Sequence, residues 1–197
     1  MGDVLRIKEK IIIVDVDGVL LDWEYHFEKW VKEKYCYDMV NPFSYKINEK
    51  YNIPRDEGRK MARDFNESTD IAFLSPLRDA VKYIRKLHEE HGYMFHAITS
   101  LSNRVSAQKL RINNLESLFG RVFDEYNILD TGADKDDALL KYKDTGAFWI
   151  EDKPDNVDTG IRLGLNGILV AHAHNASYKG DAKRMYKWSD IYREIVS

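Results

Sequence analysis

The stretch IIIVDVDGVLLDW at residues 11–23 decides the fold class. Four apolar residues lead into Asp15 and Asp17, which are two positions apart, and Gly18 follows them. A short apolar run without helical periodicity is typical of a buried strand. Residues two apart on a strand point the same way, so both carboxylates can converge where the strand ends. Most Asp-x-Asp pairs are turns or solvated charges, so this pair needs support from the rest of the chain.

Four further apolar runs have about the length of strands. They lie at 93–100, 121–126, 147–152 and 167–172, and helical patterns separate them. Strands that alternate with helices predict an α/β fold, with a central parallel sheet flanked by helices. Ligands of such sheets bind beyond the carboxyl ends of the strands. Functional side chains end four of the five runs, namely Asp15 with Asp17, Thr99 with Ser100, Glu151 with Asp152, and His172 with His174.

The segment at 75–92 shows the clearest helical pattern. Ser75 is a candidate cap, Pro76 suits the first helical position, and Gly92 follows the end. One face of this helix would carry Leu77, Ala80, Val81, Ile84 and Leu87.

Residues 22–76 do not fit the alternation of strands and helices. A helical stripe of aromatic and aliphatic residues begins at Trp23, and a second helical pattern opens near Pro54. We therefore expect a small helical cap over 22–76, inserted after the first strand. The catalytic core would then consist of residues 1–21 and 77–197.

Composition narrows the choice of partners and location. The chain has 197 residues, of which 44% are hydrophobic and 32% charged, as in globular domains. The net charge of −3 argues against a broad nucleic-acid or anionic-membrane surface. One cysteine, Cys36, excludes an internal disulfide. The charged opening does not resemble a signal peptide, and no apolar run approaches the roughly 20 residues that span a bilayer, so we expect a cytoplasmic protein without a membrane partner.

Two carboxylates at one strand end repel each other unless a cation or a proton intervenes. Mg²⁺ fits because it prefers oxygen ligands and often binds through one or two carboxylates plus a substrate phosphate. One aspartate could then attack phosphorus, and the other could act as acid and then as base.

Four motifs in this sequence resemble those of the haloacid dehalogenase (HAD) superfamily of phosphohydrolases. DVDGVL at 15–20 resembles the first motif, and Thr99 in HAITS resembles the second. Lys135 in TGADKDDALL resembles the third, and Asp152 with Asp155 in WIEDKPDN resembles the acidic fourth motif. All four stand in the family's order and span essentially the whole chain. The resemblance implies a Rossmann-like core.

A closer resemblance is to the 5′(3′)-deoxyribonucleotidases within that superfamily. It is carried by DVDGVLLDWE, FLSPLRDAVKYI, ITS, IEDKPDN and the His-Asn pair in AHAHN at 171–175. The sequence departs from the family's pattern at Glu151, where Asp is usual, and at Leu101, where Pro is usual. The insert aligns poorly beyond Trp23.

The resemblance implies a role for each motif residue. Asp15 would be the nucleophile that forms an aspartyl-phosphate, and Asp17 the general acid and base. Asp15, the backbone carbonyl of Asp17, and Asp152 would hold Mg²⁺. Asp155 would ligate the metal through water or orient Lys153, although it could instead cap a helix. The phosphoryl oxygens would be bound by Thr99, Ser100 and Lys135.

Three aromatic residues near the joints of the insert are candidate substrate contacts, namely Trp23, Phe27 and Phe73. They could stack on a nucleobase. The alternative is that they form the insert's own small core.

These observations predict an Mg²⁺-dependent phosphomonoesterase for small phosphate esters, above all (deoxy)nucleoside monophosphates. The alternatives are a sugar-phosphate phosphatase, a polynucleotide 3′-phosphatase, and a non-catalytic nucleotide-binding protein. A polynucleotide substrate would need an exposed basic track for the strand, and the balanced charge of the chain argues against it. A homodimer is implied only by the resemblance.

Overall fold

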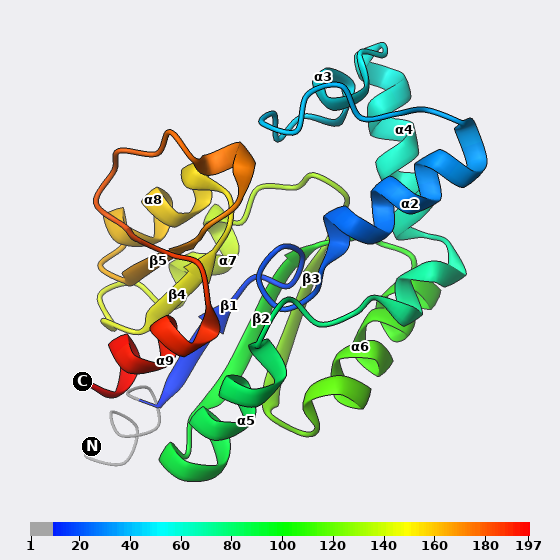
Figure 1. Cartoon of the computed structure of the whole chain (residues 1–197). Coiled ribbons are helices and arrows are strands. Elements are labelled where there is room, and N and C mark those ends of the chain that lie inside the picture. Colours follow the sequence, from blue (N-terminus) through cyan, green and yellow to red (C-terminus); the bar gives the residue numbers. More distant parts are fainter. Residues whose placement is uncertain (1–9) are drawn as a thin grey trace.

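A six-stranded, all-parallel sheet forms the centre of the molecule in the computed structural model, which describes residues 10–197 (Figure 1). The strand order is β3-β2-β1-β4-β5-β6, and the predicted α/β fold is confirmed. Residues 1–9, which include most of the charged opening and the start of the predicted core segment 1–21, lie outside the described residues. The strands are β1 Ile11–Val14, β2 Met94–Ser100, β3 Phe123–Leu129, β4 Phe148–Glu151, β5 Asn166–Val170 and β6 Lys183–Met185.

Strand β1 lies in the middle of the sheet. It pairs with β2 on one side, where Val14 lies opposite Ala97, and with β4 on the other, where Val14 lies opposite Ile150. The chain therefore leaves β1 at the point where the strand order reverses direction. Such switch points are where open parallel sheets bind ligands, because the loops on either side diverge.

Two helical layers cover the sheet. Helix α5 contacts α6 and α9, whereas α7 contacts α8. Side chains of β1 alternate between two hydrophobic clusters, with Ile12 and Val14 in one and Ile13 in the other. This alternation follows from the two-residue repeat of a strand. The helices are α2 Trp23–Tyr35, α3 Ile47–Tyr51, α4 Arg55–Asn66, α5 Ala80–His91, α6 Val105–Phe119, α7 Asp136–Leu140, α8 Pro154–Arg162 and α9 Trp188–Val196.

Helix α5 begins later than the sequence predicts. Its N-cap is Asp79 rather than Ser75, while Gly92 ends the helix as expected, with a φ of +70°. Pro76 pairs with Leu21 in an isolated bridge, and the Leu77 N–H donates to the Leu20 carbonyl at 2.8 Å. These bonds hold the segment extended. The predicted start is therefore wrong, because contacts with the residues after β1 override the local capping signal.

The segment between β1 and α5 contains α2, α3, α4 and a 3₁₀ helix at Thr69–Phe73 (upper right of Figure 1). Its two ends meet: the Asp22 N–H donates to the Ser75 carbonyl at 2.9 Å, and His26 Nε2 lies 3.0 Å from Ser75 Oγ. We propose that residues 22–76 act as a cap on the remaining core.

Within residues 10–197, no helix combines the length and the apolar character needed to cross a membrane.

Candidate active site

Three carboxylates and one ammonium group meet at the carboxyl edge of the sheet. Asp15 follows β1, Glu151 ends β4, and Asp152 follows β4 directly. One oxygen from each of these three lies within 4.8 Å of the others, and all three residues are buried. Lys135 Nζ lies 2.7 Å from Asp15 Oδ1 and 2.9 Å from Glu151 Oε2. The fold thus brings together Asp15, Lys135 and Asp152 as the sequence predicts.

Burial and mutual repulsion set the protonation of this cluster. Burial and the charge of Glu151 raise the pKa of Asp15 well above its usual value. Burial and the neighbouring carboxylates of Glu151 and Asp15 likewise raise the pKa of Asp152. Burial alone would raise the pKa of Glu151 as well, but the Lys135 ammonium lowers it to about 2. Burial opposes the charge of Lys135, yet Asp15 and Glu151 raise its pKa.

The charges of this cluster fit a divalent cation. Three ionised carboxylates and one ammonium carry a formal charge of −2, which such a cation would neutralise. Carboxylate oxygens are the ligands that Mg²⁺ prefers. Asp15 and Asp152 are the better candidates, because Glu151 already accepts from four donors.

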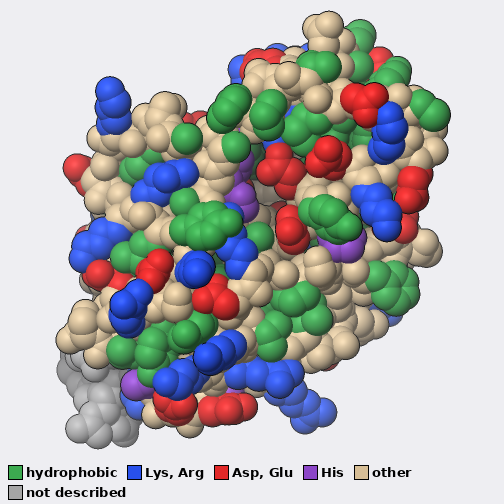
Figure 2. All heavy atoms as spheres, in the orientation of Figure 1, with side chains coloured by type: hydrophobic (Ala, Val, Ile, Leu, Met, Phe, Trp, Pro, Cys, Tyr) green, Lys and Arg blue, Asp and Glu red, His purple; other side chains and the backbone are tan. Residues whose placement is uncertain are grey.

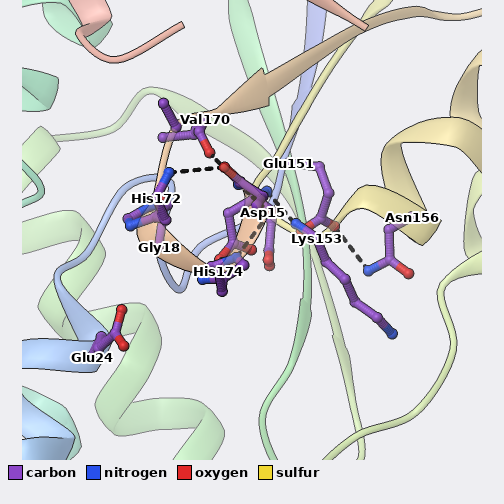
Figure 3. A network of polar contacts seen from close by, with 12 residues as sticks. Asp15, Gly18, Glu24, Glu151, Lys153, Asn156, Val170, His172 and His174 are labelled. Atoms are coloured by element: carbon purple, nitrogen blue, oxygen red, sulfur yellow. Dashed lines mark hydrogen bonds and ion pairs between the residues drawn. The ribbon is translucent and has the colours of Figure 1, made fainter. Parts of the chain in front are cut away.

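Glu151 is the centre of the local hydrogen-bond network (Figure 3). Its carboxylate accepts from the backbone N–H groups of Asp152 and Lys153 at 3.0 and 3.1 Å, and from Asn156 Nδ2 and Lys135 Nζ at 3.0 and 2.9 Å. The sequence places Glu151 at a strand end and marks it as a departure from the family's pattern, but it does not assign it a role. Its side chain orients Lys135 and fixes the start of α8.

Asp155 lies apart from the cluster. Its side chain is exposed in the first turn of α8, whereas the next residue, Asn156, is buried and contacts Glu151. The predicted role of Asp155 as a ligand through water stays a prediction.

The turn after β1 passes so close to Asp152 that position 18 requires glycine. The φ of Gly18 is +75°, and a Cβ atom built there would lie 2.6 Å from Asp152 Oδ2. The sharp turn after β1 therefore leaves room for the Asp152 carboxylate and no more.

We expect Gly18→Ala to lose stability and to bind Mg²⁺ more weakly. A left-handed backbone costs a non-glycine residue about 1–2 kcal/mol, and the new methyl group would also displace Asp152. Gly132→Ala is the matched control, because Gly132 has a φ of +74° but nothing within 4 Å of the added atom. Urea unfolding and calorimetric titration with Mg²⁺ would compare the two. Equal losses in both variants would contradict the close approach.

A histidine and asparagine loop after β5 holds both halves of the site together (Figure 3). His172 Nε2 lies 2.6 Å from the Gly18 carbonyl oxygen, and His174 Nε2 lies 3.1 Å from the Asp152 carbonyl oxygen. Asn175 Nδ2 donates to the carbonyls of Asp152 and Val170, both at 2.8 Å. The loop thus links the turn after β1 to the end of β4.

We expect His172 to make stability depend on pH. Burial lowers the pKa of His172 from 6.5 to about 4. Between these values the unfolded chain binds a proton that the folded chain does not, so stability falls as the pH drops. One such proton contributes up to about 1.4 kcal/mol per pH unit. Urea unfolding of the wild type and His172→Gln at about pH 7 and about pH 5 checks this. The same pH slope in both proteins would contradict the prediction.

Thr99 and Ser100 end β2 beside the cluster but differ in their contacts. Thr99 is 1% exposed, and its hydroxyl has no hydrogen-bond partner within residues 10–197. A buried unpaired hydroxyl is costly, so it is suited to bind a ligand oxygen. Ser100 Oγ instead donates to the Ala133 carbonyl at 2.8 Å, which ties β2 to the loop before Lys135.

Two of the three predicted aromatic contacts lie in the core of the insert, and the substrate contact of Phe73 stays a prediction. Phe27 is buried and stacks on Trp23, with ring centroids 4.4 Å apart. The Trp23 indole N–H donates to Asn66 Oδ1 at 2.9 Å. Both residues therefore belong to the insert's own core. Phe73 is 77% exposed, on the 3₁₀ helix of the insert.

Tyr45 is the aromatic residue of the insert that reaches the carboxylates, and the sequence reasoning missed it. Its ring lies 5.2 Å from the His174 ring, and Lys153 Nζ lies 5.7 Å from its centroid. Desolvation and the charges of Asp152 and Glu151 raise the pKa of the Tyr45 hydroxyl, although about half of the residue is exposed. It lies in a loop without regular structure, so no periodicity could reveal it. Figure 2 shows the surface hollowed between the insert and the core, with acidic and histidine side chains at the margin.

Solved structures with a similar fold include HAD-like hydrolases. A haloacid dehalogenase-like hydrolase from Streptococcus pneumoniae has a TM-score of 0.66 at 13% identity, covering 95% of this chain and 98% of that one. CbbY from Rhodobacter sphaeroides, solved in complex with phosphate, has a TM-score of 0.61 at 14% identity, covering 92% and 96%. These similarities show that the chain has a HAD-like fold.

The family is more specific than the fold. The model of the family described as "5′ nucleotidase, deoxy (Pyrimidine), cytosolic type C protein" matches residues 9–197, and the chain belongs to this family. It is accordingly a phosphoric monoester hydrolase. A 32.4 kDa protein from the Gp30-rIII intergenic region of Enterobacteria phage T4 is 27% identical over an alignment of 196 residues. The match covers 94% of this chain and 69% of the phage protein.

Proposed function

We propose that this protein is an Mg²⁺-dependent phosphatase of (deoxy)nucleoside monophosphates that acts through an aspartyl-phosphate. The observation that carries the proposal is the buried Asp15 carboxylate, paired with Lys135 at 2.7 Å beside two further carboxylates. Membership of a deoxynucleotidase family supports the substrate class. A cytoplasmic location and a homodimer stay predictions.

The reaction has two steps on one aspartate. Asp15 attacks phosphorus, the ester P–O bond breaks, and Asp17 gives a proton to the leaving oxygen. Water then attacks the aspartyl-phosphate, Asp17 takes its proton, and the Asp15 carboxylate is released. Asp15, the Asp17 carbonyl and Asp152 would hold Mg²⁺, which supplies neutralisation of the phosphoryl charge. Thr99, Ser100 and Lys135 would bind the phosphoryl oxygens.

The test is release of phosphate from a substrate panel with Mg²⁺ or with a chelator. The panel holds deoxynucleoside and ribonucleoside monophosphates, sugar phosphates and a 3′-phosphorylated oligonucleotide. We expect Mg²⁺-dependent release from nucleoside monophosphates above all. A clear preference for sugar phosphates or for the oligonucleotide would replace the proposed substrate, and full activity with chelator would refute the metal dependence.

Tyr45 is our candidate for the base contact, because it is an aromatic residue of the insert beside His174 and Lys153. We expect Tyr45→Ala to raise KM for nucleoside monophosphates by about tenfold, since stacking on a base contributes about 1–3 kcal/mol. Tyr25→Ala is the control, an exposed aromatic of the same insert whose loss should leave KM near the wild-type value. Steady-state kinetics on a nucleotide and on a base-free phosphate ester separates the effects. A rise in KM shared by both substrates would argue against a base contact.

A further inference from the structure

A partly buried ion pair joins Asp17 to helix α6. Arg111 lies on this helix with no exposed surface, and its Nη1 donates to Asp17 Oδ1. The Asp17 side chain is partly exposed, at 21%. Each of the two motif aspartates therefore has its own cation, Lys135 for Asp15 and Arg111 for Asp17.

The guanidinium of Arg111 is poorly satisfied. Its Nε and Nη2 have no hydrogen-bond partner among the described residues. Unpaired buried donors are costly, and a buried ion pair often stabilises a protein no more than well-packed apolar side chains do. Folding stability alone is thus a weak reason for an arginine at this position. Its effect on the Asp17 carboxylate is the better reason.

The contact leaves one oxygen of Asp17 available. Arg111 binds Oδ1, and no hydrogen bond to Oδ2 occurs within residues 10–197. A carboxylate held by one oxygen has a defined orientation, while the other oxygen can still give or take a proton. Helix α6 also packs against the 3₁₀ helix that returns from the insert, and Asn114 Nδ2 donates to the Leu74 carbonyl at 3.1 Å. The arginine therefore approaches Asp17 from a rigid support.

We propose that Arg111 is a positioning residue that orients the Asp17 carboxylate toward the leaving oxygen of the substrate. This role rests on the proposed function, in which Asp17 transfers the proton. Arg111 itself touches Asp17 and acts through it.

A double-mutant cycle with two substrates tests this role. Deoxynucleoside monophosphates need a proton on the leaving oxygen, whereas p-nitrophenyl phosphate releases a stable phenolate that needs none. We expect Arg111→Met to lower kcat/KM for the nucleotide by about 10²-fold, within the range of general acid catalysis, with a loss at least about tenfold smaller for p-nitrophenyl phosphate. In an Asp17→Asn background, Arg111→Met should cause no further loss, because residues that act through one another are not additive.

Two further variants guard against a purely structural effect. Arg111→Lys keeps a cation beside Asp17 and should retain most of the discrimination between the substrates. Asn114→Ala removes another buried polar side chain of α6 and should lower stability without changing the ratio of the two kcat/KM values. Equal losses on both substrates, or additive losses with Asp17→Asn, would overturn the proposal. A wild-type protein without activity on either substrate would instead overturn the proposed function, and this role with it.

Discussion

Asp15→Asn is expected to lower kcat by on the order of 10⁴-fold or more. The amide lacks the carboxylate oxygen that must attack phosphorus, so it cannot form the aspartyl-phosphate that the proposed reaction requires. Neither of the other two carboxylates in the cluster can take over, because Glu151 accepts from four donors and Asp152 is enclosed by Gly18 and the loop after β5. Phosphate release from a nucleoside monophosphate, measured with Mg²⁺ at saturating substrate, gives the value.

The folding of this variant should not suffer. Burial raises the pKa of Asp15, so the charged carboxylate is unfavourable where it lies, and a neutral amide of the same size removes that cost. We expect a melting temperature without Mg²⁺ at or above that of the wild type. Asp181→Asn, at an exposed position, is the control for the substitution itself. Substantial turnover in a well-folded Asp15→Asn protein would exclude Asp15 as the nucleophile.

Lys135→Met should be the most damaging single change to stability. It removes the one ammonium group within residues 10–197 that contacts both Asp15 and Glu151, and all three side chains are buried. Breaking a buried ion pair by removing one partner costs about 3–5 kcal/mol, because the other charge is left unpaired. Turnover should fall as well, since Lys135 is a proposed ligand of the phosphoryl oxygens. Urea unfolding in a chelating buffer measures the stability loss.

Adding Mg²⁺ should reduce that loss, because a divalent cation would offset part of the missing positive charge. Lys141→Met is the matched control: Lys141 pairs with Glu125 where both side chains are about 40% exposed. Pairs of that kind contribute about 0–1 kcal/mol. A loss in Lys135→Met no larger than in Lys141→Met would show that the buried carboxylates do not depend on this lysine.

The sequence predicts well those features that depend on strong local patterns. Apolar runs that end in Asp15, Thr99 and Asp152 identify three strands, and parallel topology then brings their ends together. Strand β6 lacks such a pattern: its three residues, Lys183–Met185, include two exposed cations, so only pairing with β5 makes them a strand.

The features that the sequence does not reveal depend on contacts between distant segments. Arg111 lies in a polar stretch of a helix and reads as a solvated charge, yet the approach of the turn after β1 buries it. Asp155 and Asn156 are adjacent, and only the direction in which α8 leaves β4 decides that Asn156 turns inward. The position of Tyr45 beside the site depends on how the insert folds back over the core. In each case, packing rather than periodicity determines the role.

The hydrogen bond between Asp22 and Ser75 has a consequence for how this enzyme could diversify. The chain leaves the core and returns to it at the same point. The segment between Asp22 and Ser75 is therefore a closed insertion, and a change in its length would hardly disturb the sheet. The entropy of closing such an insertion grows only slowly with its length. A lineage could therefore exchange this segment for a longer, shorter or differently shaped one without rebuilding the catalytic strands. New substrate ranges would then arise by replacement of the insert at the Asp22–Ser75 junction.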